Sequence, residues 1–375
     1  MNKPNELIEW ISNYSDTELR SAAAYYDRME TFPDNHVKTL FELDIFKKLY
    51  SDNHDLPYKD YLSIIRKISK NFPALGSILL TQESHSIWPL VTFGTTKQKD
   101  KYLEKLISGD IYGSFALNEP ITGSEVSDMD TLAIETETGW LLNGKKEYIS
   151  NSPIASVFLV AAKIQRLDKS ESVGIFVIDK EFKGLAVGET EKKMGIKSLP
   201  VAGIDLTAVS LPKDALLGDK DSGLEQIQSI LNRNRLSVAA QSLGIAGGAL
   251  ERGLQYVSYD RNLGKRLIDM QSTQFKLAEI ETNIYASRAL LLSVIDENQF
   301  DSRFVAMAKL AASDLAIETA ESVIQMTGGY GYMRNNDIER FVRDAKITAI
   351  YGSSSSRLKR VIAEPWVNNV KKEEK

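Results

Sequence analysis

The sequence predicts a mainly α-helical fold with a small β-barrel or sandwich domain in the middle. Two changes of pattern along the 375 residues lead to this prediction. Apolar residues recur at helical spacing at first, short β-rich runs separated by turn residues come next, and long helical patterns fill the rest. We therefore expect an N-terminal helical domain over residues 1–112, a β domain over 113–215 and a C-terminal four-helix bundle over 216–375.

The first region carries the apolar stripes of several amphipathic helices. Leu62, Ile65 and Ile68 share one helical face. Residues 100–107 read as a short amphipathic helix that ends near Gly109.

The middle region alternates short apolar runs, such as 174–178 (GIFVI), with turn residues. Within residues 140–149 the pair Asn143-Gly144 predicts a type I′ hairpin turn, because that turn needs a positive φ at both central positions. We therefore expect two strands joined by this turn.

Long periodic segments predict the helices of the last region. They cover residues 224–259, 270–295, 303–326 and 356–370, and their lengths are typical of a four-helix bundle. A glycine-rich run at 328–331 (GGYG) lies directly after the third segment and separates it from the fourth.

The composition excludes several chemistries. Cysteine is absent, which removes disulfides, thiolate nucleophiles and Cys-ligated metals. The three histidines (His36, His54 and His85) lack HxxxH spacing, so we expect no metal site. A formal charge of −5 and no long basic block argue against a nucleic-acid partner. Since no apolar run is long enough for a signal sequence or a membrane span, we expect a cytoplasmic protein.

Three motifs indicate a ligand site. Residues 115–124 (FALNEPITGS) form a polar loop whose amides and hydroxyls suit a flat, heteroatom-rich ligand. In residues 142–151 (LNGKKEYISN), Tyr148 and Ser150 share one face of a strand. Residues 325–332 (QMTGGYGY) indicate close backbone approach to a pyrophosphate or to another helix. Each motif also has a purely structural interpretation, as a turn between domains or as packing.

These motifs, in this order, resemble the acyl-CoA dehydrogenase family. There they read roughly FALTEPxAGS, NGxKxWITN and QxxGGxGY. Residues 271–279 (QSTQFKLAE) and 338–348 (IERFVRDAKIT) are similar to family motifs too, and the resemblance spans about residues 20–363. It implies the acyl-CoA dehydrogenase fold, an FAD-dependent oxidoreductase that acts on an acyl thioester, and a homodimer or homotetramer.

The resemblance also implies which residues bind the cofactor. Gln325, Gly328 and Gly329 would face the FAD pyrophosphate of a neighbouring subunit. Substrate contacts would come from Ser124, Asn234 and Arg235. The full set of FAD-binding residues implied by position is Phe115, Leu117, Asn118, Gly123, Ser124, Tyr148, Ser150, Arg261, Leu263, Gln271, Gln274, Gln325, Gly328, Gly329, Ser354 and Ser356.

Three positions depart from the family pattern on the flavin side. Tyr148 and Ser150 stand where the family usually has Trp and Thr. Asp260 stands where the family usually has an Arg, and Arg261 would serve from the next position.

The usual catalytic base is missing. Family members remove the α-proton of the thioester with a Glu, usually in the motif IYEGT, while the β-hydride leaves for the flavin. Here that stretch reads IYGSSSS, and the aligned residue is Gly352. A minority of the family places the Glu on the first long bundle helix, where this chain has Asn234. The catalytic residues therefore stay unassigned, with Ser353 and Ser354 as weak candidates for a proton relay.

Three explanations remain open: a displaced base such as Glu119 or Glu147, an inactive enzyme, or a reaction without α-proton abstraction. We favour the last, because the flavin-side motifs are retained. Residues 77–88 (SILLTQESHSIW) and the compact length are similar to the extender-unit dehydrogenases of polyketide and nonribosomal peptide biosynthesis. Those enzymes oxidise a hydroxymalonyl or aminomalonyl semialdehyde on an acyl carrier protein to the acid.

Other functions remain as alternatives: a conventional acyl-CoA dehydrogenase with a displaced base, a flavin-dependent monooxygenase or oxidase, and a catalytically silent FAD-binding partner protein. The substrate would be a CoA thioester or an acyl carrier protein, and the electron acceptor an electron-transfer flavoprotein or oxygen.

Overall fold

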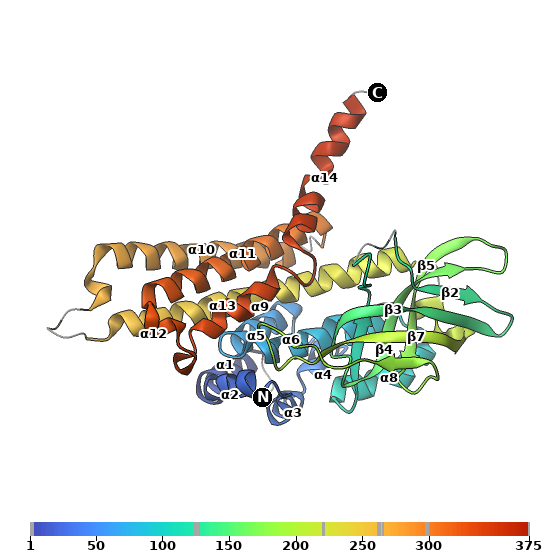
Figure 1. Ribbon diagram of the computed structural model, residues 1–375, viewed down its shortest axis with the longest axis horizontal. Coiled ribbons are helices and arrows are strands. Elements are labelled where there is room, and N and C mark those ends of the chain that lie inside the picture. Colours follow the sequence, from blue (N-terminus) through green and yellow to red (C-terminus); the bar gives the residue numbers. More distant parts are fainter. Residues whose placement is uncertain are drawn as a thin grey trace.

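Three regions succeed one another along the chain: a helical region, a β-sheet and a second helical region (Figure 1). This order confirms the predicted fold class, mainly α with a β domain in the middle. The sheet lies at one end of an elongated body, and the long helices run away from it. The computed structural model describes residues 4–123, 126, 128–219, 222–260, 264, 266–296 and 300–373.

The N-terminal region is helical, as its apolar stripes predict. Leu62, Ile65 and Ile68 are buried on one face of their helix. The last helix starts with a capping box at Thr95 and ends at Gly109, whose φ of 83° closes it. The elements are α1 (Pro4–Tyr14), the π-helical turn η1 (Ser15–Leu19), α2 (Arg20–Met29), α3 (Asp34–Phe41), α4 (Ile45–Leu49), α5 (Tyr58–Ser69), α6 (Pro73–Gln82), the π-helical turn η2 (Glu83–Ile87), α7 (Trp88–Phe93) and α8 (Thr96–Ser108).

The middle region is one seven-stranded sheet in the order β1-β4-β2-β3-β7-β6, with β5 paired to β4. Alternation along β4 explains how it separates two cores. Phe158 and Val160 point into a core that the folded sheet encloses, whereas Val157 and Leu159 join the core shared with the helices. The strands are β1 (Tyr112–Ala116), β2 (Leu132–Glu135), β3 (Gly139–Ser150), β4 (Ala155–Gln165), β5 (Glu171–Asp179), β6 (Leu185–Val187) and β7 (Val201–Pro212).

The hairpin turn predicted at Asn143-Gly144 is wrong, because β3 continues through both residues. The ladder with β7 shifts register beside Leu142, which marks a bulge. A Cβ on Gly144 would lie 2.5 Å from Thr131 Oγ1, so close packing explains this glycine. Asn143 Oδ1 accepts a hydrogen bond from the Ala208 amide (2.8 Å).

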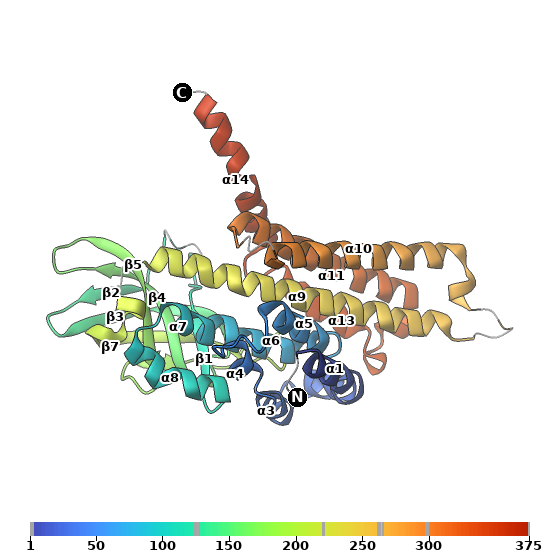
Figure 2. The ribbon, with the colours of Figure 1, turned by 180° about the vertical axis from the view of Figure 1, so that it is seen from behind.

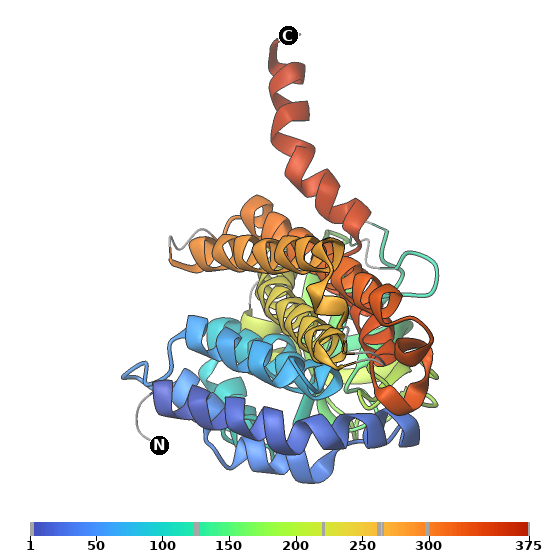
Figure 3. The same ribbon diagram turned by 90° about the vertical axis from the view of Figure 1, so that its left-hand side faces the viewer.

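The three longest helices end within one residue of their predicted bounds. The predicted 356–370 segment is helix α14, which contacts α11, and the shorter helix α13 packs beside the long helices as well, in contact with α9 and α11. Helix α14 buries Leu358 against this body and then projects away from it, leaving Trp366 exposed (Figure 3). The elements are η3 (Lys213–Ala215), η4 (Leu217–Asp219), α9 (Gly223–Ser258), η5 (Leu267–Asp269), α10 (Gln271–Asp296), α11 (Ser302–Thr327), α12 (Gly329–Tyr332), η6 (Arg334–Asn336), α13 (Glu339–Thr348) and α14 (Ser355–Glu373).

Helix α9 connects the three regions. It contacts α5 and α6 of the N-terminal region, β5 of the sheet, and α10 and α11 (Figure 2). One apolar core accordingly includes Leu79, Leu159 and Leu236, one residue from each region. In the part of the chain that the structure describes, no helix has the length and apolar character needed to cross a membrane.

Two neighbouring glycines of α9 provide a test of this packing. A Cβ on Gly248 would lie 1.9 Å from Lys70 O, whereas a Cβ on Gly247 would meet nothing within 4 Å. We expect Gly248→Ala to lower the free energy of unfolding by about 1–3 kcal/mol through overpacking. Gly247→Ala should raise it by about 0.5–1 kcal/mol, because alanine is the better helix former. Urea denaturation of both variants checks this, and equal effects would contradict the close approach of α9 to the end of α5.

Candidate active site

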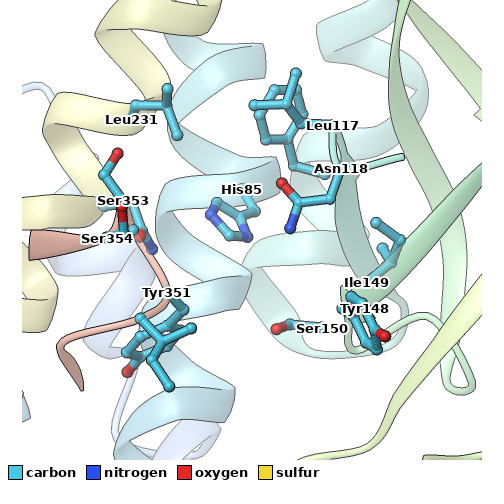
Figure 4. Close-up of a pocket in the computed structure, with 14 residues that line it drawn as sticks. His85, Leu117, Asn118, Tyr148, Ile149, Ser150, Leu231, Tyr351, Ser353 and Ser354 are labelled. Atoms are coloured by element: carbon cyan, nitrogen blue, oxygen red, sulfur yellow. The ribbon is translucent and has the colours of Figure 1, made fainter. Parts of the chain in front are cut away.

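A cavity of about 200 Å³ lies where the sheet, α9 and the loop before α14 meet. Figure 4 shows Leu117, Asn118, Tyr148 and Ser150 on the sheet side, the loop residues opposite, and His85 of η2 between them. The residues that line the cavity are His85, Phe115, Leu117, Asn118, Tyr148, Ile149, Ser150, Leu231, Asn234, Ile350, Tyr351, Gly352, Ser353 and Ser354.

The cavity brings together many of the positions that the resemblance implies for flavin and substrate. They come from β1, β3, α9 and the loop before α14, which are far apart along the chain. A second cavity of about 260 Å³ adjoins it and shares Tyr148, Ser150, Ile350 and Tyr351 with it. The implied residues that line the first cavity are Phe115, Leu117, Asn118, Tyr148, Ser150, Asn234, Gly352, Ser353 and Ser354.

Other implied positions lie elsewhere. Gln325 lines a separate surface hollow beside Ser272 and Thr273 of α10, and its contact with a neighbouring subunit's FAD stays a prediction. Gln274 donates to Ile268 O (2.9 Å). Positions at element ends or on exposed surface are Gly123, Gln271, Gly328, Gly329 and Ser356. Three implied positions, Ser124, Arg261 and Leu263, lie outside the described residues.

A buried ion pair fastens the first motif to the second. Lys146 Nζ lies 2.7 Å from Glu119 Oε1 and also donates to Leu117 O (3.2 Å), and the two charged side chains are 0% and 2% exposed. Glu119 further accepts hydrogen bonds from the amides of Asp130 (2.6 Å) and Thr131 (2.9 Å). These contacts fix the position of the loop that carries Leu117 and Asn118 relative to β3.

This pair is ionised at neutral pH. Burial by itself would raise the pKa of Glu119, but the hydrogen bonds from Lys146 and from the loop lower that pKa to about 2. Burial lowers the pKa of Lys146 to about 8, which still leaves it protonated. Glu119 is thus engaged in structure, and neither it nor Glu147 lines the cavity, so both are poor candidates for a displaced base.

The two family positions for the catalytic Glu converge at one point of the cavity. A Cβ on Gly352 would lie 2.9 Å from Asn234 Oδ1. Asn234 Nδ2 donates to Ser84 Oγ (3.1 Å), which fixes its amide. Among the described residues that line the cavity there is no Asp and no Glu.

Two buried cations lie behind the Gly352–Ser353 loop. The Arg235 guanidinium donates to Gly352 O (3.2 Å) and Ser353 Oγ (2.8 Å), and Lys309 Nζ donates to Ser353 O (2.7 Å). They are 1% and 0% exposed, and neither forms an ion pair with a carboxylate of the described chain. Burial and then the nearby Arg235 charge lower the pKa of Lys309 to about 7. Arg235, implied as a substrate contact, is thus a support of the loop and not part of the cavity wall.

The loop conformation depends on these contacts. Gly352 and Ser353 both have positive φ values, 64° and 102°. A serine at such a φ is strained and persists only where its surroundings hold it. Both polar oxygens of Ser353 are held by the two cations, which keeps the loop turned toward the cavity.

Sequence reasoning missed His85, Leu231, Ile149, Ile350 and Tyr351 as lining residues. His85 sits inside an apolar helical stretch, which normally indicates packing. Only its position in the π-helical turn η2 directs the ring to the cavity, 5.8 Å from the ring of Phe115. Tyr351 could have been found, because it adjoins Gly352 in the base motif; its hydroxyl donates to Gln241.

The ion pair predicts a large difference between two adjacent lysines. Lys146→Met leaves Glu119 buried without its partner and should lower the free energy of unfolding by about 3–5 kcal/mol. Lys145→Met removes only an exposed contact to Asp205 (3.8 Å) and should change stability by less than about 0.5 kcal/mol. Urea denaturation with cofactor absorbance gives both values. Similar losses in the two variants would show that the buried pair does not fasten the loop.

Comparison with known proteins agrees with this architecture. Models of the acyl-CoA dehydrogenase N-terminal, middle and C-terminal domains match residues 3–110, 114–209 and 221–366. The short-chain specific acyl-CoA dehydrogenase of Rattus norvegicus mitochondria is 32% identical over 365 residues, which cover 95% of this chain and 88% of that protein.

Solved structures are similar over nearly the whole chain. The butyryl-CoA dehydrogenase of Megasphaera elsdenii superposes with a TM-score of 0.90 at 27% identity, covering 97% of this chain and 98% of that one. The prolyl acyl carrier protein oxidase AnaB superposes with a TM-score of 0.90 at 25% identity, covering 96% and 98%. The chain therefore belongs to the acyl-CoA dehydrogenase family and is an FAD-dependent oxidoreductase.

Proposed function

We propose that this enzyme oxidises the aldehyde carbon of a semialdehyde acyl thioester to the acid, with the acyl group held on an acyl carrier protein. The observation that carries the proposal is a cavity wall without a carboxylate among its described residues. Asn234 and Gly352 occupy the two positions where the family resemblance implies the Glu that removes the α-proton.

The cavity suits the flavin ring of FAD. Phe115, Leu117 and Tyr148 offer apolar and aromatic surface for a flat ring system. Asn118 and Ser150 offer hydrogen-bonding groups at its edge. When bound, FAD supplies the acceptor for a hydride that leaves the substrate carbon.

The lining residues are a poor fit to α,β-desaturation. Removing an α-proton from a thioester requires a basic group placed over that carbon. The groups at the two Glu positions, an amide and a glycine, and the neighbouring serine hydroxyls cannot supply it, and burial raises the pKa of Tyr351 further above its ordinary value. A hydrated aldehyde has a different requirement. Hydride leaves the carbon that bears two hydroxyl groups, one O–H proton is lost, and a carboxylic acid results, so no C–H proton is removed.

The buried cations favour an acidic product. The Arg235 guanidinium places a positive group behind Gly352, and Lys309, with a pKa of about 7, adds a partial positive charge; neither forms an ion pair with a carboxylate of the described chain. In a family member with the usual IYEGT motif, the Glu at this position would supply the compensating negative charge. In this chain the negative charge can come from the ligand, and an acid product ionises to a carboxylate, whereas an enoyl thioester gains no charge.

The likeness to AnaB supports a carrier-protein substrate, because that enzyme is named as a prolyl acyl carrier protein oxidase. The likeness to the rat enzyme favours a second candidate, dehydrogenation of a short-chain acyl-CoA. The lining of the cavity favours the first of the two. The proposed contact of Gln325 with a neighbouring subunit's FAD requires a homodimer or homotetramer.

Anaerobic flavin reduction tests the proposal. The FAD-loaded enzyme is mixed with butyryl-CoA, or with an acyl carrier protein that bears a 2-hydroxy-3-oxopropanoyl thioester. We expect the semialdehyde to bleach the oxidised-flavin band and to yield the malonate-level acid by mass spectrometry. Butyryl-CoA should leave the band unchanged, because no carboxylate occupies either position implied for the α-proton base. Bleaching by butyryl-CoA alone would overturn the proposal and support the second candidate.

A carboxylate introduced at the base position should reverse this selectivity. Asn234→Glu puts a negative charge where the acid product forms, so semialdehyde oxidation should fall by about tenfold or more relative to the neutral Asn234→Gln. Asn234→Glu should also acquire bleaching by butyryl-CoA, which Asn234→Gln should lack. Equal semialdehyde rates in the two variants would argue against an anionic product at this position.

A further inference from the structure

His85 is the one imidazole among the described residues of the cavity wall, and the chemistry above leaves it unused. Figure 4 shows its ring between the sheet-side residues and the loop residues. Its Nδ1 atom is shielded from solvent and has no hydrogen-bond partner among the described residues. Nearly all buried polar atoms have such a partner, so an imidazole beside a cavity with an unpartnered nitrogen is a candidate for a functional role.

The polar neighbours of His85 on η2 each make a contact within the protein, although Glu83 does so through one carboxylate oxygen only. Glu83 is bound by Arg233 (2.6 Å), and Ser84 Oγ donates to Leu80 O (2.6 Å). Ser86 Oγ donates to Gln82 O (2.6 Å). A π-helical turn contains one more residue than an α-helical turn, and such turns are often found at functional positions. Here it brings the ring of His85 into the cavity while its polar neighbours stay in the core.

We propose that the imidazole of His85 accepts the hydroxyl proton of the substrate as hydride leaves the same carbon, an assignment that rests on the proposed function. The substrate C–H bond breaks and its hydrogen leaves with the electron pair as a hydride, for which bound FAD would be the acceptor. The O–H bond breaks and a bond from that hydrogen to an imidazole nitrogen forms. The electron pair of the O–H bond completes the C=O bond of the acid, and the imidazolium proton passes to water after product release.

A weak base is sufficient for this step. Burial lowers the pKa of His85 to about 4, so the ring is neutral at physiological pH and one nitrogen offers a lone pair. As hydride departs, the hydroxyl proton becomes strongly acidic and passes to such a base readily.

The other hydroxyl groups of the wall are less suited to accept a proton. Ser353 Oγ already accepts a hydrogen bond from Arg235, whose positive charge disfavours protonation. Ser354 Oγ accepts from the Arg357 amide (3.4 Å). Tyr351 donates its hydroxyl proton to Gln241. On the loop side of the cavity these contacts occupy the hydroxyl groups, whereas Asn118, Tyr148 and Ser150 on the sheet side are the groups proposed to face the flavin ring. His85 is thus the acceptor that neither set of contacts uses.

The test compares His85→Gln with His54→Gln in the FAD-loaded enzyme. His54 is exposed and lies outside the cavity, so its variant controls for the loss of an imidazole. With the carrier-bound semialdehyde, the single-turnover rate of flavin bleaching should fall by about 100-fold or more in His85→Gln and stay unchanged in His54→Gln. FAD content and the flavin spectrum should be unchanged in both. Added imidazole should restore part of the rate in His85→Ala.

Two readouts separate the possible failures. If the wild-type enzyme does not oxidise the semialdehyde, the proposed function fails; if it does and His85→Gln is equally fast, only the assignment of His85 fails. A solvent isotope effect is measured on the wild-type enzyme, so it does not depend on the folding of any variant. Slower bleaching in D₂O is expected, since the O–H proton moves together with the hydride. Equal rates in H₂O and D₂O would overturn the proton transfer to His85.

Discussion

The ion pair between Glu119 and Lys146 is the constraint on which the candidate active site depends. It joins the loop after β1 to β3 in a place that water does not reach, and there an unpaired charge would be costly. Because Lys146 also holds the Leu117 carbonyl, the cavity-lining residues of both motifs share one rigid support. The opposite wall has an equivalent support, in which Arg235 and Lys309 hold the loop at Ser353.

The two walls of the cavity differ in whether a carboxylate neutralises their buried cations. The sheet-side lysine has its carboxylate, and the pair is neutral overall. Arg235 and Lys309 on the loop side form no ion pair with a carboxylate among the described residues, and Gly352 stands where the family resemblance implies a Glu. The proposed acid product would supply a negative charge beside them.

Much of the fold could be predicted from the sequence because its signals are local. The bounds of α9, α10 and α11 result from helical periodicity over more than twenty residues each. Residues such as Tyr148 and Ser150 could be assigned because short motifs specify them. The signal failed where packing overrides local preference: Gly144 looks like a turn residue but is required by the closeness of Thr131. The position of α13 in the bundle also depends on contacts distant in sequence.

The sequence by itself determined the order of helices and strands and the family, and it predicted that Gly352 and Asn234 stand where a catalytic Glu is implied, since each of these depends on residue identity and spacing. Only the tertiary structure decided that Asn234 and Gly352 meet at one point, that Arg235 supports the loop, and that His85 opens into the cavity. The physical reason is that burial, charge compensation and hydrogen-bond satisfaction depend on neighbours from other elements. The spacing of residues along the sequence does not show which charged side chains lack an ion-pair partner.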